Sequence, residues 1–193
     1  MSSPRIILAS NSPRRRDLLR QIGLEFTVDP ADVDERRLTG ESAEVFAVRV
    51  ALDKAHVAAD RAGEGLVIAA DTIVVLGDAV MGKPQQASDA VRMLTALSGR
   101  EHQVLTGLAV IDATTGKSMT GLARTSVLFR RLSTREIEAY VATGEPLDKA
   151  GAYGIQEKGA LFVESITGCY YNVVGLPISL LGEMLTNFGI DVW

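Results

Sequence analysis

The segment from Ser10 to Arg15, which reads Ser-Asn-Ser-Pro-Arg-Arg, has the residue types of a phosphate-binding turn. It precedes an apolar helical pattern, so its backbone amides would lie at a helix N-terminus, where they lack intrahelical acceptors and the helix dipole adds positive charge. The Ser10 hydroxyl and the Arg14 guanidinium would add directed donors for phosphate oxygens. A capped surface helix with scattered arginines explains this motif equally well. The motif therefore indicates either an anion site or an ordinary helix start.

A second candidate is the pair Asp71-Thr72, which interrupts the apolar run from Leu66 to Leu76. A carboxylate in an apolar strand is costly unless it is paired or bound to a metal. The alternative is an aspartate at a strand end that accepts a backbone amide. The uninterrupted apolar flanks favour a compensated carboxylate, which makes Asp71 a candidate site residue.

Three lysines, Lys54, Lys83 and Lys149, are candidate cations for a phosphate site. Lone lysines are usually solvated, so solvent exposure is the default expectation for each of them. Lys83 is the most informative, because Gly82 and Pro84 fix a turn just beyond the Asp71 strand. That turn would hold the Lys83 ammonium near the end of the strand.

The segment from Asp148 to Gln156 is rich in glycine and other small residues. Glycine lets the backbone approach a ligand closely, and the Gln156 amide offers both a donor and an acceptor for a nucleobase edge. A glycine-rich structural loop would explain most of the same pattern. The sequence has no P-loop, no dinucleotide-binding glycine motif and no nucleophile elbow, and His56 and His102 lack metal-ligand spacing.

Composition limits the classes of partner. The 193 residues suit a single domain over 1–193, with a bilobed form around a central cleft as a variant. A formal net charge of −4 and a pI of about 5.3 argue against a surface built for a nucleic acid polymer. Cys169 is the only cysteine, which suits a reducing compartment. The apolar run Ile6 to Ala9 is too short for a membrane span or signal peptide, so we expect a cytoplasmic protein without membrane contact.

Hydrophobic periodicity and turn residues predict the elements that must position these residues. Strands are expected at 5–9, 25–28, 66–76, 102–112, 118–130 and 161–166, and helices at 13–22, 42–63, 87–97, 134–143 and 176–188. The segment 29–40 is predicted to be a loop, and Thr134 is predicted to cap its helix. Residues 114–117 join two long strands as an antiparallel hairpin. We therefore expect the α/β class, with a mixed, mostly elongated β-sheet flanked by helices.

Taken together and in order, short motifs along nearly the whole chain resemble the Maf family of nucleoside triphosphate pyrophosphatases. The motifs are Leu8 to Arg15, Ala70 to Thr72, Gly82 to Pro84, Leu97 to Gly99, Tyr140-Val141, Asp148 to Gln156 and Val174 to Pro177. Within the family, the segment Asp148 to Gln156 is similar to the branch that acts on dTTP and UTP.

The resemblance implies a divalent-metal-dependent hydrolase that cleaves dTTP and UTP between the α- and β-phosphates. Modified pyrimidine triphosphates are further candidate substrates. The implied fold resembles the inosine triphosphatase architecture, the implied assembly is a homodimer, and the implied role is nucleotide-pool sanitation or cell-division arrest. A non-enzymatic regulator that binds nucleotide or nucleic acid is the alternative, since the family has been linked to inhibition of septum formation.

The resemblance also assigns roles to individual residues. Asp71 matches the proton acceptor of the family, and Lys83 is assigned a catalytic role beside it. Glu35 and Asp71 are the expected metal ligands, and their oxygen atoms suit Mg²⁺ or Mn²⁺. Whether Asp71 acts as base, ligand or both stays open. The expected substrate-binding residues are Ser10, Arg14, Lys54, Thr72 and Gln156.

Overall fold

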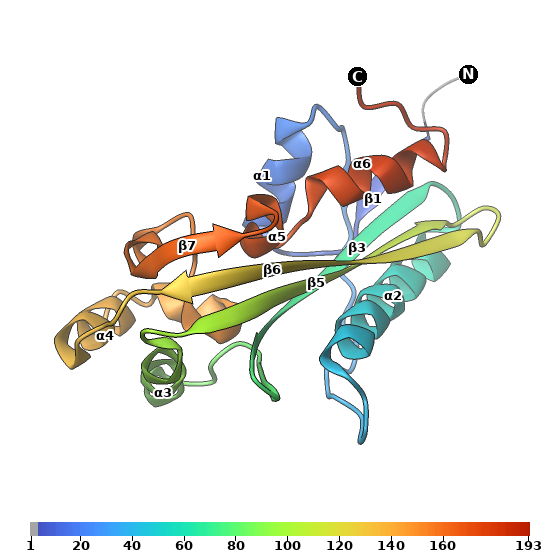
Figure 1. Ribbon diagram of the computed structural model, residues 1–193. Coiled ribbons are helices and arrows are strands. Elements are labelled where there is room, and N and C mark those ends of the chain that lie inside the picture. The colour runs from blue at the N-terminus through green and yellow to red at the C-terminus, as the bar shows by residue number, and fades with distance from the viewer. Residues whose placement is uncertain (1–3) are drawn as a thin grey trace. The chain divides into compact units, whose positions relative to one another are not determined.

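The computed structural model describes residues 4–193 (Figure 1). These residues form two compact units. Unit 1 contains the described residues up to Asp71, together with Thr106–Ala123 and Gly175–Trp193. Unit 2 contains Thr72–Leu105 and Arg124–Val174. The chain passes between the units several times, so neither unit is a continuous stretch of sequence.

A seven-stranded mixed sheet has the order β2-β1-β3-β5-β6-β7, and β4 pairs with β3 off this path. Strand β1 pairs in parallel with β2 and β3, whereas β4 and β7 pair antiparallel with β3 and β6. The mixed sheet that the sequence predicted is therefore confirmed. The strands are β1 (Ile6–Leu8), β2 (Thr27–Val28), β3 (Leu66–Leu76), β4 (Ala79–Met81), β5 (Glu101–Asp112), β6 (Ser118–Phe129) and β7 (Val163–Thr167).

In unit 1, helix α2 (Ala43–Ala62) covers one face of the sheet, and α1 (Pro13–Gln21) and α6 (Ile178–Thr186) lie on the other (Figure 1). Alanines on the buried face of α2 pack against apolar side chains of β1, β3 and β5. A Cβ atom at Gly107 of β5 would overlap the backbone at Ala47, so the helix and strand backbones meet directly. This close packing places the α2 side chains firmly against the sheet.

Unit 2 is built around an aromatic cluster. Helices α3 (Ala87–Leu97) and α4 (Thr134–Val141) contribute to a buried core that also contains Phe129, Tyr153 and Phe162. Rings in this core meet edge to face, with 4.7 Å between the centroids of Phe129 and Tyr153.

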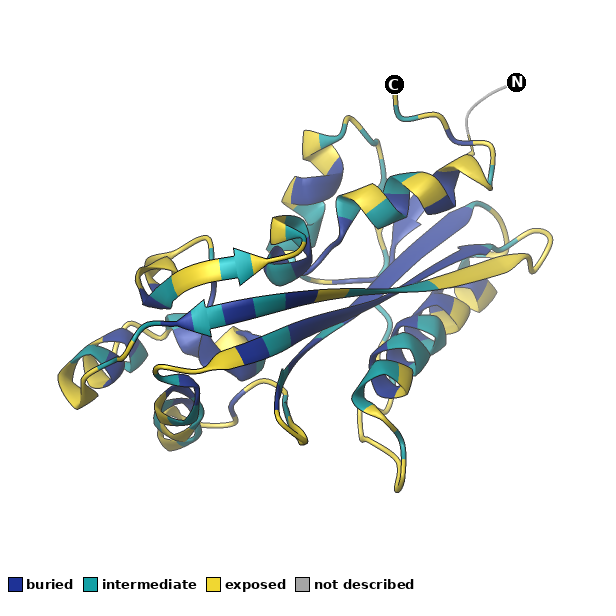
Figure 2. Ribbon diagram, in the orientation of Figure 1, coloured by how far each residue is buried: buried dark blue, intermediate teal, exposed yellow. Residues whose placement is uncertain are grey.

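Figure 2 shows the buried middle of the long strands and the exposed tip of the β5–β6 hairpin.

Most element predictions hold, and the errors have local causes. The predicted strand 66–76 and helix 87–97 match β3 and α3 at both ends. Ser133, and not Thr134, caps α4, because its hydroxyl accepts the Glu136 amide in a capping box. The predicted strand 25–28 is shorter, since only Thr27–Val28 pair.

Corrections are larger in the last third of the chain. The predicted strand 161–166 begins at Val163, because Lys158–Phe162 forms the 3₁₀ helix η3. The predicted helix 176–188 is only Ile178–Thr186, and α5 (Tyr170–Val174) was not predicted. Two further 3₁₀ helices, η1 (Glu145–Asp148) and η2 (Ala150–Ala152), shape the glycine-rich segment. Across the described residues, no helix is long and apolar enough to cross a membrane.

Candidate active site

Lys54 lies between two carboxylates in unit 1. Its Nζ is 2.7 Å from Asp71 Oδ1 and 2.7 Å from Glu35 Oε1. Lys54 projects from the buried face of α2, and Asp71 lies inside β3 and not at its end; each is 9% exposed. Asp71 is thus compensated by an ion pair, one of the two ways in which such a carboxylate becomes tolerable. The Glu35 side chain is 54% exposed, so this charge cluster opens toward solvent on the Glu35 side.

Arg15 joins the start of α1 to this cluster, although it was not among the predicted site residues. Its Nη1 donates to Ser10 Oγ over 3.0 Å, and its Nε donates to the Gly175 carbonyl over 2.8 Å. Burial lowers the pKa of Arg15, while the negative charges of Asp71 and Glu35 partly oppose that shift. The Arg15 guanidinium therefore interacts electrostatically with the carboxylates of both Asp71 and Glu35. The arginine run in the sequence was the available signal, but it does not say which arginine turns inward.

The N-terminus of α1 has no side-chain cap, in contrast to the start of α2. Ser12 occupies the N-cap with Pro13 at the first position, but the Ser12 side chain makes no cap bond. By contrast, the Ser42 hydroxyl caps α2 by accepting the Val45 amide over 3.2 Å. The first turn of α1 contains no acidic residue, and Arg14 adds a positive charge that further lowers the pKa of Arg15. This end of α1 is therefore electropositive, as an anion site requires.

The loop that carries Glu35 is fastened to α2 through Arg49. The Arg49 Nε lies 2.7 Å from Glu41 Oε1, and its Nη2 donates to the Arg36 carbonyl over 3.0 Å. Hydrogen bonds from Arg49 and then from the Leu38 amide lower the pKa of Glu41. Side-chain bonds thus tie down both the residue next to Glu35 and the end of its loop.

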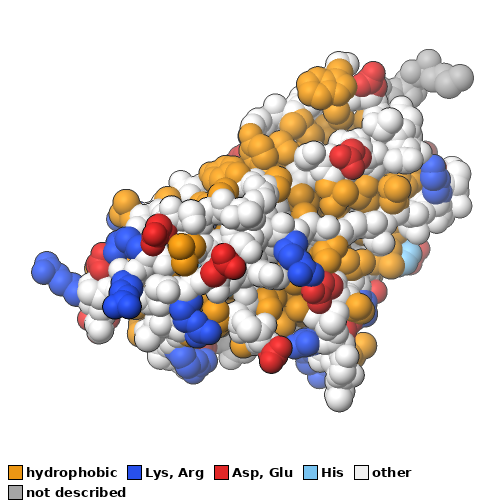
Figure 3. Space-filling view, in the orientation of Figure 1, with side chains coloured by type: hydrophobic (Ala, Val, Ile, Leu, Met, Phe, Trp, Pro, Cys, Tyr) orange, Lys and Arg blue, Asp and Glu red, His pale blue; other side chains and the backbone are white. Residues whose placement is uncertain are grey.

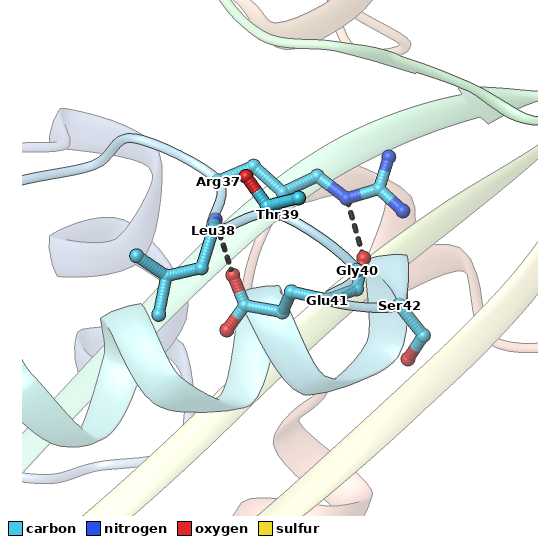
Figure 4. A pocket seen from close by; sticks show the side chains of 6 residues that line it. All are labelled: Arg37, Leu38, Thr39, Gly40, Glu41 and Ser42. Atoms are coloured by element: carbon cyan, nitrogen blue, oxygen red, sulfur yellow. Dashed lines mark hydrogen bonds between the residues drawn. The ribbon is translucent and has the colours of Figure 1, made fainter.

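Figure 4 shows a surface hollow lined by residues 37–42, just after Glu35. Within it, Arg37 Nε donates to the Glu41 carbonyl over 2.7 Å, and the Leu38 amide donates to Glu41 Oε2 over 3.0 Å. None of the predicted site residues lines this hollow. Both hydrogen bonds join residues of the same loop, and they hold that loop in one shape.

Thr72 and Lys83 belong to unit 2, on and beside β3. Strand β4 runs back antiparallel along β3, with Met81 opposite Val74. The exposed Lys83 comes two residues after Met81, so the chain has already turned back along β3. The backbone at Lys83 has thus passed the end of the Asp71 strand, and the position of the Lys83 ammonium stays a prediction. The β3–β4 hairpin sets this backbone path, and β4 was not predicted from the sequence.

The glycines at 151 and 154 are explained by packing within unit 2. The Gly151 amide donates to the Gly82 carbonyl over 3.0 Å, and a Cβ at Gly151 would crowd Val74. A Cβ at Gly154 would crowd the Lys149 side chain. The structural interpretation thus accounts for these glycines, whereas Gln156 remains exposed on the same segment.

Lys149 is not the solvated cation that the sequence suggested. It is only 5% exposed, and its Nζ donates to the Glu145 carbonyl and to Asp148 Oδ1, each over 2.8 Å. Glu157 Oε1 lies 3.6 Å away. Lys149 therefore stabilises the glycine-rich segment from within.

The predicted metal ligands, Glu35 and Asp71, are brought together by Lys54. Within residues 4–193, no group of three or more His, Cys, Asp or Glu side chains could hold a metal ion. Two carboxylates nevertheless fit Mg²⁺ or Mn²⁺, since Mg²⁺ is commonly bound through one or two carboxylates, with waters and substrate phosphates as the remaining ligands. The donor set thus suits an ion that binds together with a nucleotide.

Comparison with known proteins gives a consistent assignment. The family model described as Maf-like protein matches residues 5–188. A dTTP/UTP pyrophosphatase of Moorella thermoacetica is 52% identical over 191 residues, covering 98% of this chain and 97% of the relative. One from Desulforamulus reducens is 50% identical, covering 97% and 98%, and one from Clostridioides difficile is 46% identical, covering 95% and 94%.

Solved structures share the fold. The HAM1 protein of Coxiella burnetii superposes with a TM-score of 0.57 at 19% identity, covering 95% of this chain and 99% of the other. The Ham1 protein of Staphylococcus aureus gives a TM-score of 0.54 at 20% identity, with the same coverage. These similarities confirm the expected architecture, which resembles that of inosine triphosphatase.

Proposed function

The chain belongs to the Maf family, and from this premise we propose that it hydrolyses dTTP and UTP between the α- and β-phosphates, yielding pyrophosphate and the nucleoside monophosphate. One observation carries the proposal. Relatives that are 46–52% identical over nearly their whole length are named dTTP/UTP pyrophosphatase. At the motif from Asp148 to Gln156, the sequence keeps the pattern of the branch that acts on these two nucleotides.

The charge cluster of unit 1 suits binding of a triphosphate. Lys54, Arg15 and Arg14 supply positive charge, and the electropositive N-terminus of α1 supplies backbone donors. In this proposal the incoming phosphates give Lys54 new partners in place of part of its ion pairing. Ser10 Oγ accepts bonds from Arg15 and from the Ser12 amide, so its hydroxyl proton can point toward a phosphate oxygen.

Asp71 is the proposed proton acceptor for the attacking water. It sits at the buried end of the cluster, where a carboxylate is poorly solvated and interacts strongly with nearby charge. Together with Glu35 it would hold the divalent ion, which when bound neutralises phosphate charge and polarises water. Lys83 is proposed to stabilise the charge that develops on the phosphates.

Thr72 and Gln156 are the proposed residues for base selection, with Arg14 contributing at the phosphates. The Gln156 amide can pair with the donor and acceptor groups on a uracil or thymine edge. A site that relies on such bonds rejects a base that leaves them unmade. Modified pyrimidine triphosphates that keep this edge are included as substrates.

The wider setting is also proposed. We infer a cytoplasmic homodimer that acts on free nucleotides, in nucleotide-pool sanitation or cell-division arrest. The net charge of −4 supports a small substrate over a nucleic acid polymer. Figure 3 supports the same inference, because acidic and basic side chains are interspersed on the face that it shows.

The decisive experiment is a pyrophosphate-release assay with purified protein. The substrates are dTTP, UTP, dATP and GTP, each with Mg²⁺, with Mn²⁺ and with a chelator. We expect release from dTTP and UTP, weaker release from the purine nucleotides, and none with the chelator. Binding of nucleotide without release under every condition would instead favour the non-enzymatic regulator.

A further inference from the structure

One carboxylate and one phenol hold both ends of the segment 154–159, which carries Gln156. Glu145 Oε1 accepts the Tyr140 hydroxyl over 2.7 Å and the Gly159 amide over 3.2 Å. Glu145 Oε2 accepts the Lys158 amide over 3.2 Å. The Tyr140 hydroxyl in turn accepts the Gly154 amide over 3.2 Å. The backbone is thus bonded to the same pair of side chains before and after Gln156.

The pair is itself rigidly placed. Tyr140 is 4% exposed, and its ring meets Phe162 edge to face at 4.9 Å between centroids. Burial, and then the hydrogen bond to Glu145, raise the pKa of Tyr140, so its hydroxyl keeps its proton and donates. A Cβ at Gly159 would lie too close to both the Gly154 carbonyl and the Tyr140 hydroxyl. The two ends of the segment therefore pack against each other.

The direction of the Gln156 side chain depends on the backbone that Glu145 and Tyr140 hold. Its side chain is exposed and makes no hydrogen bond to the described part of the chain. Because no side-chain hydrogen bond fixes the amide, the backbone of residues 154–159 decides where it points. The bonds to Glu145 and Tyr140 are made by that backbone.

We propose that Glu145 and Tyr140 are positioning residues that set base selectivity by holding the Gln156 segment in one conformation. The inference rests on the proposed function, since it concerns the same nucleotide site. Neither residue is assigned a contact with substrate. Their effect passes through the backbone amides of Gly154, Lys158 and Gly159.

The test uses two variants and a matched control. Tyr140→Phe keeps the ring but removes the hydroxyl, and Glu145→Gln keeps the shape but removes the charge and one acceptor. Glu136→Gln is the control, because Glu136 also accepts a backbone amide, that of Ser133 over 2.8 Å, but caps α4 instead of holding residues 154–159. For each protein, kcat/KM is measured for dTTP and dATP, and amide hydrogen exchange is followed across 154–159.

In Tyr140→Phe and Glu145→Gln, we expect faster exchange in the segment and a fall of about three- to tenfold in the dTTP-to-dATP ratio of kcat/KM, the size expected for one lost hydrogen bond. Glu136→Gln should leave both unchanged. An unchanged ratio in the two variants, or an equal fall in the control, overturns the inference. If the wild type releases no pyrophosphate from any nucleotide, the proposed function fails separately. In that case amide hydrogen exchange still tests the positioning role. Exchange rates across residues 154–159 that are the same in Tyr140→Phe, Glu145→Gln and the wild type overturn it.

Discussion

The paired carboxylates of unit 1 and the Glu145 carboxylate of unit 2 are bonded to their partners in different ways. Asp71 and Glu35 are bonded to a side-chain cation, Lys54, whereas Glu145 is bonded to a phenol and to backbone amides. Side-chain ion pairs can exchange partners when a charged ligand arrives, because no backbone has to move. Bonds to backbone amides cannot be exchanged without deforming the segment that contains them. The first arrangement suits chemistry on a phosphate, and the second suits a fixed recognition surface.

Both units bury a lysine beside a carboxylate, Lys54 in unit 1 and Lys149 in unit 2, but unit 2 also buries a titratable group that has no counter-charge. Unit 1 buries opposite charges together, as in Lys54 and Asp71. Unit 2 buries His102 beside Tyr153, with 2.9 Å between Nε2 and the phenol oxygen, and burial lowers the pKa of His102 to about 4. A neutral histidine in an aromatic core needs no counter-charge. Three predictions test this contrast.

Asp71→Asn should have the largest effect. The amide keeps the shape of the side chain but loses the charge that a proton acceptor or metal ligand needs, so turnover should fall about 10²–10⁴-fold while the protein stays folded. The measurements are kcat for pyrophosphate release from dTTP and a thermal unfolding curve. Asp17→Asn is the control, since Asp17 is exposed on α1 and pairs only with Arg20 among the described ion pairs. Near-wild-type turnover in a folded Asp71→Asn protein would remove Asp71 from the mechanism.

Acid should destabilise the protein through His102. Its pKa is lower in the folded state, so the stability it confers is full above about pH 6.5 and is lost as the pH falls toward 4. Between pH 7 and 4.5 the free energy of unfolding should drop by about 2 kcal/mol on this account. Carboxylates with a lowered pKa, such as Glu136 at about 2, lose their contribution mainly below this window.

Urea unfolding at pH 7, 5.5 and 4.5 measures this effect. His102→Gln removes the titrating ring, so its stability should change less with pH over the same range. His56→Gln serves as the control, because His56 is exposed on α2. A pH dependence that is equally steep in His102→Gln would show that the acid sensitivity arises elsewhere.

Gln156→Ala should have the smallest of the three effects. Loss of one neutral hydrogen bond is worth about 0.5–1.5 kcal/mol, and somewhat more if a buried partner is left unsatisfied, so the preference for dTTP and UTP over dATP and GTP should fall several-fold to tens-fold. Metal dependence should not change. The measurement is the ratio of kcat/KM values, with Gln85→Ala, another exposed glutamine in unit 2, as the control. A parallel fall for all four nucleotides would mean that Gln156 orders the loop and does not read the base.

Much of the fold could be predicted from the sequence because its signals are local. The apolar run of β3 and the 3.6-residue pattern of α3 are complete within their own segments, so both elements were predicted to the residue. The five-residue helix α5 and the three 3₁₀ helices are too short to show a period. The hairpin partner β4 is three residues long and was missed for the same reason.

By itself, the sequence determined which residue types are available for phosphate chemistry and where the long elements begin and end, because capping, periodicity and turn residues act over a few positions. Only the tertiary structure decided which charges meet. It turned Arg15 toward Ser10 and the Gly175 carbonyl, paired Lys54 with Glu35 and Asp71, and buried Lys149 among carboxylate and carbonyl oxygens. Ion pairs form between elements distant in the chain, and their partners depend on packing that no local pattern records.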